Sequence, residues 1–573
     1  MTSEDKVTYF GETDARNKKI KFGIKSKDRT RHMYVIGKTG MGKSTLLENM
    51  AVQDIQNGEG LAFIDPHGKT ADLLLNYVPE NRIKDVVYFA PFDVEFPTSF
   101  NVMEDVGYDK RHLVVSGLMS TFKKIWLDAW SARMEYILTN TLLALLEYPG
   151  ATLLGVNKML SDKDYRKKVV ANISDPSVKS FWVDEFAKYT DKFAAEATPA
   201  IQNKIGQFTN NPLIRNIIGQ PKSSFDIRKM MDERKIIIIN LSKGLVGESN
   251  ANLLGAMFIT KIYLGAMSRA DTQEKVLRTL PNFYLYVDEF QSFANESFAD
   301  ILSEARKYKL NLTIAHQYIE QMSEEVRAAV FGNVGTMIAF RIGSFDAEIL
   351  EKEFAPKFTA EDIVNLGFAQ IYLRLMIDGI GSQPFSATTL PPIAEPPVSF
   401  REQVIQHSRA TYGQLRSIVE EGVKLQTIGE DKPVYVPPPL APVSSSISLS
   451  PRTSTPQFQD RRNDRRDDRR PTNNYQDTRP RPQAPVYQTA QRKAPPPDES
   501  GGFLNIANLK ENNQRNNLSH RSGPPEKKSI TQEAKNDLKQ ALEAIIKKPQ
   551  MSPSSNQQKK EVPEDVLKKV LDM

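Results

Sequence analysis

The stretch Tyr34-Val-Ile-Gly-Lys-Thr-Gly-Met-Gly-Lys-Ser-Thr45 decides how this chain of 573 residues folds. An apolar run typical of a β-strand ends at Gly37, and a helix-forming run begins after Ser44. The spacing G-x-x-x-x-G-K-S is that of a P-loop, whose backbone N–H groups wrap a phosphate chain that a bulky residue at position 42 would obstruct. The sequence therefore predicts a nucleoside triphosphate site.

The predicted contacts to the nucleotide come from this loop and the first turn of the following helix. Lys43 is expected to reach the β- and γ-phosphates, and the Ser44 hydroxyl is expected to ligate Mg²⁺. The full predicted set is Gly37, Lys38, Thr39, Gly40, Met41, Gly42, Lys43, Ser44 and Thr45.

A carboxylate site is predicted where the apolar run Asn282-Phe-Tyr-Leu-Tyr-Val-Asp-Glu289 ends. Asp288 would hold Mg²⁺ through water, and Glu289 would polarise the attacking water. The alternative is a buried strand that ends in two solvated acids, because this pattern alone is common. Adjacent Asp and Glu favour ATP-hydrolysing motors over kinases, which need a separate phosphoacceptor site. ATP and Mg²⁺ are therefore the expected ligands.

Two further residues are candidates for the catalytic set. Gln317 ends a predicted strand next to that of Asp288, where a neutral amide could sense the γ-phosphate; the alternative is a polar strand end. Arg306 lies on the predicted helix between these strands and is a candidate arginine finger acting on a neighbouring subunit. Its alternative is an ordinary basic residue beside Lys307 on a solvated face.

Weaker signals accompany these motifs. Asp65-Pro-His-Gly68 is expected to end a strand at the nucleotide edge, with His67 as a local hydrogen-bonding residue rather than a catalyst. Arg133 is a candidate phosphate or subunit contact, or an ordinary surface arginine. Ser242 and Lys243 follow a central strand and are candidates for lining the pore or the site.

The alternation of short apolar runs and helical patterns predicts a parallel sheet with crossover helices. Strand signals are absent from about residue 101 to residue 229, where helical patterns dominate. The predicted fold class is therefore a doubly wound α/β domain interrupted by an all-α insertion. The expected units are a β-hairpin segment (1–30), the P-loop domain (31–100 and 230–395), the insertion (101–229), a C-terminal helix (396–432) and a tail (433–573).

The tail differs from the rest of the chain in charge and composition. From residue 441 onward there are 24 Lys and Arg against 16 Asp and Glu, whereas residues 1–440 hold 52 against 54. A Pro-rich segment with few aromatic residues cannot offset its conformational entropy, so it is predicted to be disordered. Candidate short helices lie at 530–548 and 563–573. The Arg-rich tract 461–470 could contact nucleic acid or be a self-neutralising solvated segment.

Composition excludes several classes of protein. The chain has no cysteine, which excludes disulfides, thiolate zinc sites and thiol catalysis. It has no apolar run long enough for a transmembrane helix and no signal-peptide pattern at its start, so a cytoplasmic location is expected. Peripheral attachment to a membrane through a partner remains compatible with this expectation.

The order of motifs resembles the FtsK/HerA superfamily of DNA-pumping ATPases, and most closely its type IV secretion (conjugative) coupling-protein branch. The shared order is the P-loop, Asp65-Pro-His-Gly68, a helical insertion, Val-Asp-Glu-Phe290, Ala-Arg-Lys307 and His-Gln-Tyr318. The resemblance implies a RecA-like motor, with Lys43, Ser44, Asp288 and Glu289 as its ATPase core. Because 36 residues precede Gly37 in this sequence, a hairpin is expected there in place of the transmembrane helices or N-terminal β-barrel of related proteins.

The expected function is an ATP-driven, hexameric DNA translocase. Its expected partners are copies of itself, DNA, a membrane or secretion-channel component, and DNA-processing proteins recruited by the tail. Two alternatives stay open: a secretion-system ATPase without DNA cargo, and a nucleotide-gated binding adaptor. DNA-stimulated ATP hydrolysis would separate the translocase from both.

Overall fold

The computed structural model describes residues 5–428 apart from 15–17, 127–129, 190 and 296. The predicted disordered tail, its Arg-rich tract and its two candidate helices lie outside the described residues. Among the described residues, no helix combines the length and apolar character needed to cross a bilayer.

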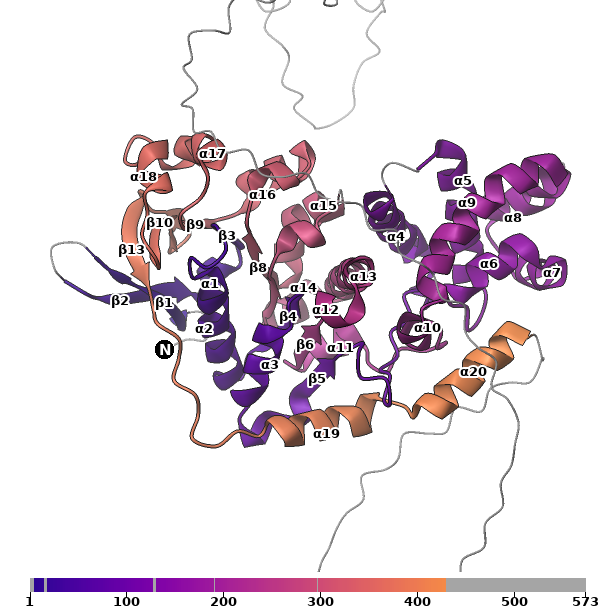
Figure 1. Cartoon of the computed structure of the whole chain (residues 1–573), viewed down its shortest axis with the longest axis horizontal. Coiled ribbons are helices and arrows are strands. Elements are labelled where there is room, and N and C mark those ends of the chain that lie inside the picture. Colours follow the sequence, from indigo (N-terminus) through magenta and orange to yellow (C-terminus); the bar gives the residue numbers. More distant parts are fainter. Residues whose placement is uncertain (1–4, 15–17, 127–129, 190, 296, 429–573) are drawn as a thin grey trace, which may run out of the picture. The chain divides into compact units, whose positions relative to one another are not determined.

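Eleven strands form one sheet in the order β2-β1-β13-β10-β9-β3-β8-β7-β4-β6-β5 (Figure 1). Neighbours from β9 to β5 are parallel, whereas the pairs at the β2 side of β9 are antiparallel. The strands are β1 (Val7–Thr13), β2 (Lys21–Lys25), β3 (Met33–Ile36), β4 (Gly60–Asp65), β5 (Val86–Phe89), β6 (Ile236–Asn240), β7 (Phe283–Val287), β8 (Leu310–His316), β9 (Thr336–Ala339), β10 (Gln370–Arg374) and β13 (Phe385–Thr389).

The parallel strands are buried on both faces, as their continuous apolar sequences require. In β6, Ile236 and Ile238 pack in one core, and Ile237 and Ile239 pack in the other, because side chains alternate along a strand. Helices α2 (Lys43–Gln56), α3 (Lys69–Asn76) and α19 (Arg401–Tyr412) cover the first face. The second face is covered by α13 (Glu248–Met267), α15 (Ser297–Glu304), α16 (Glu324–Asn333) and α17 (Ser344–Phe354). The predicted doubly wound α/β fold is confirmed.

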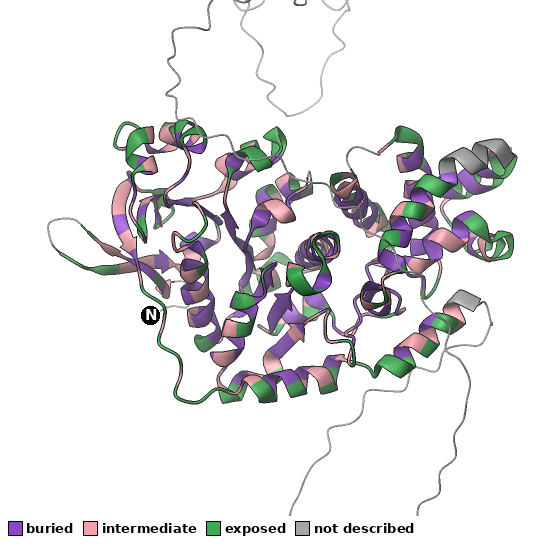
Figure 2. Cartoon of the chain, viewed as in Figure 1, coloured by how far each residue is buried: buried purple, intermediate pink, exposed green. Residues whose placement is uncertain are grey.

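An all-helical segment separates β5 from β6, as the loss of strand signals predicts. It contains α4 (Arg111–Ile125), α5 (Ala132–Leu146), α6 (Leu154–Ser161), α7 (Lys163–Ala171), α8 (Pro176–Ser180), α9 (Asp191–Thr209), α10 (Pro212–Ile218) and α11 (Ile227–Asp232). Its helices bury apolar stripes against one another, and exposed faces remain on their outer sides (Figure 2). Helix α4 also packs against α13, so the insertion shares a core with the second face of the sheet.

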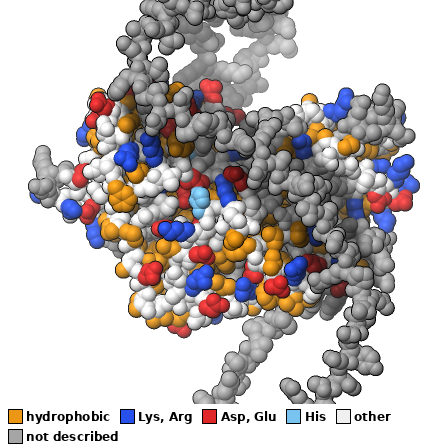
Figure 3. All heavy atoms as spheres, viewed as in Figure 1, with side chains coloured by type: hydrophobic (Ala, Val, Ile, Leu, Met, Phe, Trp, Pro, Cys, Tyr) orange, Lys and Arg blue, Asp and Glu red, His pale blue; other side chains and the backbone are white. Residues whose placement is uncertain are grey.

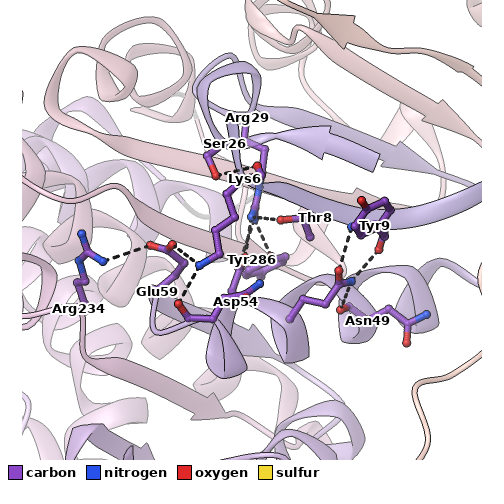
Figure 4. Close-up of polar contacts among 12 residues, drawn as sticks. Lys6, Thr8, Tyr9, Ser26, Arg29, Asn49, Asp54, Glu59, Arg234 and Tyr286 are labelled. Carbon is purple, nitrogen blue, oxygen red and sulfur yellow. Dashed lines mark hydrogen bonds and ion pairs between the residues drawn. The ribbon is translucent and has the colours of Figure 1, made fainter. Parts of the chain in front are cut away.

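The N-terminal hairpin β1–β2 is fastened to the sheet by a buried charged cluster (Figure 4). Arg29 donates to both carboxylate oxygens of Asp54 at 2.8 and 2.9 Å and to the Tyr286 hydroxyl at 2.7 Å. Arg29 also donates to the Thr8 hydroxyl at 3.1 Å and lies 3.6 Å from the centroid of the Tyr284 ring. This cluster therefore connects β1, helix α2 and strand β7.

Two elements differ from the sequence predictions. Strand β13 was not predicted, because Phe-Ser-Ala-Thr-Thr carries little apolar pattern; its pairing with β1 and β10 makes it a strand. A single C-terminal helix was predicted within 396–432, but the structure has α19 and then α20 (Arg416–Ile428). The chain breaks at Gly413, which pairs with Thr98, and the following Gln414 N–H donates to the Pro97 carbonyl. Backbone pairing with this segment replaces helix continuation.

Candidate functional site

The P-loop connects β3 to the amino end of α2 in the conformation that its glycines permit. Gly40 and Gly42 have φ values of 78° and 114°, in the left-handed region that favours glycine. Helix α2 begins at Lys43 and has no side-chain cap. Its first N–H groups, together with the positive end of the helix dipole, are therefore available to an anion.

Neighbouring strand ends hold this loop in place. The Gly37 N–H donates to the His316 carbonyl at 3.2 Å, and the Lys38 N–H donates to the Arg341 carbonyl at 2.8 Å. The Ala369 N–H donates to the Met41 carbonyl at 3.2 Å. The supports at Arg341 and Ala369 come from segments roughly 300 residues away, which no local sequence signal could predict.

Lys43 folds back over the loop that precedes it. Its ammonium donates to the carbonyls of Gly37 at 2.6 Å and of Lys38 at 3.3 Å. Burial lowers the pKa of Lys43, although the charges of Glu289 and Asp288 oppose this shift. The ammonium is therefore held over the P-loop by neutral carbonyl groups, in a position to meet an anion bound there.

Ser44 and Asp288 converge from the two motifs. The Ser44 hydroxyl donates to Oδ2 of Asp288 at 3.2 Å. Burial and the nearby charges of Glu289 and Asp65 raise the pKa of Asp288 to about 6. A hydroxyl and a buried carboxylate beside a P-loop form the oxygen-donor set that suits Mg²⁺, and a divalent cation would relieve the crowding of negative charge. These residues therefore fit the metal.

Glu289 is contacted by polar side chains from three segments. The amides of Gln317 and Gln291 donate to its Oε1 and Oε2, and Nε2 of His67 lies 3.9 Å from Oε1. Burial alone would raise the pKa of Glu289, but the nearby His67 imidazole and the hydrogen bonds from Gln317 and Gln291 lower it to about 2. Glu289 has a φ of 49°, a left-handed conformation that surrounding contacts must support. The carboxylate is thus ionised at neutral pH.

Gln317 connects this carboxylate to the P-loop. Strand β8 lies beside β7, as predicted, and Gln317 directly follows its last residue. While its amide nitrogen donates to Glu289, its Oε1 accepts a hydrogen bond from the Thr39 hydroxyl at 3.1 Å. One side chain therefore contacts both the loop and the carboxylate.

The Asp65-Pro-His-Gly68 turn lies at the same edge of the sheet. Asp65 accepts hydrogen bonds from the N–H groups of His67 at 2.8 Å and of Ala71 at 2.9 Å. This turn directs His67 toward Glu289, which raises the pKa of the imidazole. Lys243 contacts this turn through its N–H, which donates to the Pro66 carbonyl at 2.9 Å, and its ammonium donates to the Ser292 hydroxyl at 3.0 Å.

Arg306 does not meet these residues in its own chain. It is exposed on a short 3₁₀ segment, Ala305–Tyr308, which precedes β8, whereas Gln317 follows β8. A strand of seven residues separates them, roughly 20 Å at the usual rise. Arg133 lies at the start of α5 in the insertion. The structure also identifies two residues absent from the sequence predictions: Gln291, which donates to Glu289, and Lys124, which donates to the Gln291 carbonyl. Neither residue belongs to a recognisable motif.

Comparisons with known proteins identify a family and similar folds. A family described as type IV secretory system conjugative DNA transfer matches residues 1–332. The solved structure of the plasmid coupling protein TrwB in complex with ADP and Mg²⁺ is 14% identical and covers 68% of this chain and 96% of its own, with a TM-score of 0.50. VirB4 of Thermoanaerobacter pseudethanolicus is 13% identical and covers 68% and 97%, with a TM-score of 0.46. No relative was found among curated protein sequences. Because the family matches more than half of the sequence, the chain belongs to the type IV secretory system conjugative DNA transfer family.

Proposed function

We propose that this protein hydrolyses ATP and uses the energy to move DNA. The observation that carries the proposal is the convergence of two distant motifs: Ser44 meets Asp288, and Glu289 is linked through Gln317 to Thr39. The TrwB structure, from a coupling protein, contains ADP and Mg²⁺, which supports the same ligands here.

Each side chain has a role that follows from its position. The N–H groups of the loop and the Lys43 ammonium would bind the phosphates, and Ser44 and Asp288 would hold Mg²⁺. The metal, when bound, neutralises charge on the phosphate oxygens. Glu289, ionised and facing the loop, accepts a hydrogen bond from water and orients it for attack. Gln317 then reports the state of the loop, because it contacts Thr39 as well as Glu289.

The position of Arg306 supports a ring in which subunits complete one another's sites. Arg306 is exposed and lies beyond the opposite end of β8 from Gln317, so it cannot serve its own site. A neighbouring subunit in a homo-hexamer would bring this guanidinium to the phosphates. In systems where it has been measured, an arginine finger accelerates hydrolysis by about 10³- to 10⁵-fold.

DNA as cargo is supported by the family to which the chain belongs. Acidic and basic side chains are interspersed over the face seen in Figure 3, which agrees with the near balance of charge over residues 1–440. The excess of basic residues lies in the tail, which we propose recruits DNA, DNA-processing proteins or a membrane partner to a cytoplasmic motor.

Stimulation of ATP hydrolysis by DNA tests the proposal. The rate is measured for the full chain alone, with single-stranded DNA and with duplex DNA, and Glu289→Gln serves as the inactive control. Glu274→Gln, at an exposed position on α14 (Glu274–Thr279), is the matched control for loss of an acid. We expect at least one form of DNA to raise the rate. Hydrolysis that no DNA alters would favour a secretion ATPase without DNA cargo, and negligible turnover would favour a nucleotide-gated adaptor.

Mixed rings test the assignment of Arg306. Rings of Arg306→Ala subunits and rings of Glu289→Gln subunits should each be inactive. Mixtures should recover activity at interfaces where an intact Glu289 meets an intact Arg306. If rings shown to contain both subunits remain inactive, the two residues act within one subunit and the finger assignment is wrong.

A further inference from the structure

The segment that follows Glu289, residues 290–295, is hydrogen-bonded to α4, the first helix of the insertion. The Lys124 ammonium, near the end of α4, donates to the carbonyl of Gln291 at 2.6 Å and also to the carbonyl of Ala294. One turn earlier on the same helix, the Thr121 hydroxyl accepts a hydrogen bond from the Asn295 amide at 3.3 Å. Helix α4 therefore contacts both ends of this segment.

Other contacts fix the segment to α13 and to Lys243, the first residue of the short helix after β6. The Phe293 ring lies so close to Gly255 of α13 that a Cβ at position 255 would be 2.2 Å from a ring carbon. The Lys243 ammonium donates to the Ser292 hydroxyl. Glycine is thus required at position 255 to let the ring approach, and the segment is held between two helices of different parts of the fold.

Gln291 connects the contact made by Lys124 to the carboxylate of Glu289. Its carbonyl accepts the hydrogen bond from Lys124, and its side-chain amide donates to Oε2 of Glu289. Glu289 needs such support because its backbone is in the left-handed region. A cavity of about 240 Å³, lined by Thr121, Lys124 and Ser292 among others, lies beside the contact. Packing there is incomplete, and the hydrogen bonds of Lys124 and Thr121 connect α4 to the segment across this gap.

We propose that Lys124 is a positioning residue for ATP hydrolysis, through which the helical insertion holds Glu289 in its working orientation. The inference rests on the proposed role of Glu289 and adds to it a dependence on a helix that lies 164 positions away in the sequence. A change in the insertion that displaces the end of α4 would then alter turnover without altering the phosphate-binding loop.

Steady-state kinetics of the full chain test this inference. The variants are Lys124→Met, Lys124→Arg, Gln291→Ala and the Lys124→Met/Gln291→Ala double variant. The matched control is Lys158→Met, because Lys158 in α6 also donates to a backbone carbonyl, that of Gln426 in α20, away from the site. The measurements are kcat, KM for ATP and binding of a fluorescent ATP analogue, with the unfolding temperature as a check on folding.

We expect Lys124→Met to lower kcat about tenfold while KM and analogue binding stay within twofold of the wild type. Lys124→Arg should restore most of the rate, and Lys158→Met should leave it unchanged. The double variant should be no slower than the slower single variant, because contacts in one path are not additive. If Lys124→Met fails to fold, Gln291→Ala carries the test, because it removes the next contact in the same path and should also lower kcat.

Three results would overturn the inference. One is a kcat within twofold of the wild type for Lys124→Met and Gln291→Ala while Glu289→Gln is inactive; this would leave the proposed function intact. The second is a loss of nucleotide binding in place of turnover. The third is near-normal hydrolysis by Glu289→Gln, which would also overturn the proposed function.

Discussion

Strand β7 takes part in two charged clusters that differ in how their charges are paired. Around Tyr286, the Arg29 guanidinium and the Asp54 carboxylate neutralise each other with two hydrogen bonds in a fully buried position. Past the end of the same strand, Lys43 donates only to loop carbonyls in the contacts described, and the pKa of Asp288 is raised to about 6. The first cluster is complete within the chain, whereas in the proposed function the second is completed by phosphates and a metal. We assign the stability of the fold to the charges that are hydrogen-bonded to each other, and the proposed site to the charges that lack a hydrogen-bonded counter-charge in the contacts described.

The largest expected effect comes from neutralising Glu289. Glu289→Gln should lower kcat by about 10²- to 10⁴-fold, the range for loss of a positioned general base, while ATP binding persists. Its unfolding temperature should stay close to that of the wild type, because we assign the stability of the fold to the Arg29–Asp54 cluster and not to Glu289. The check is to measure the hydrolysis rate, the nucleotide affinity and the unfolding temperature of the same variant. A large loss of stability would contradict the proposed difference between the two clusters.

Breaking the Arg29 cluster should have the opposite profile. Asp54→Asn leaves a buried guanidinium without its counter-charge, which should reduce the free energy of unfolding by about 3–5 kcal/mol. The matched control is Glu274→Gln, which removes a partner from the exposed Glu274–Arg278 pair and should change stability by about 0.5 kcal/mol or less. Urea unfolding measures both, and kcat at a temperature where the variant is folded should remain near wild type. Equal effects of the two variants would contradict the assignment of stability to the buried cluster.

The smallest expected effect concerns two histidines that are buried in the neutral form. Burial lowers the pKa of His32 to about 4 and that of His316 to about 3, against about 6.5 in an unfolded chain. Below pH 6.5 these histidines become protonated in the unfolded state but stay neutral in the folded state. The free energy of unfolding therefore decreases as the pH falls below 6.5. At pH 5.5 each histidine should contribute a loss of about 1.4 kcal/mol.

Urea unfolding at pH 7.5 and 5.5 checks this pH dependence. His316→Gln should lose about 1.4 kcal/mol less than the wild type over the interval, because the variant lacks one group that is protonated only in the unfolded state. His112→Gln, at an exposed position on α4, should show the wild-type loss. A pH dependence that His316→Gln leaves unchanged would show that His316 does not titrate as its burial requires.

The sequence is most informative where a function depends on neighbouring residues. The P-loop, the strand ending at Asp288 and the helical insertion all follow from local patterns, and the strand order confirms that Gln317 lies beside them. Strand β13 and the break at Gly413 depend on pairing with distant segments, so periodicity could not reveal them. Lys124 reaches Gln291 across 167 positions, and the catalytic role of Arg306 stays a prediction because it requires a second subunit.

The most direct test asks whether the cluster of Lys43, Asp288 and Glu289 is the nucleotide site. Titration calorimetry measures the binding of Mg·ATP by the wild type and by Lys43→Ala. Asp54→Asn, examined below its unfolding temperature, is the control from the other cluster. The account predicts that the wild type and Asp54→Asn bind Mg·ATP with similar affinity and that Lys43→Ala binds it far more weakly. Unchanged affinity in Lys43→Ala would contradict the account.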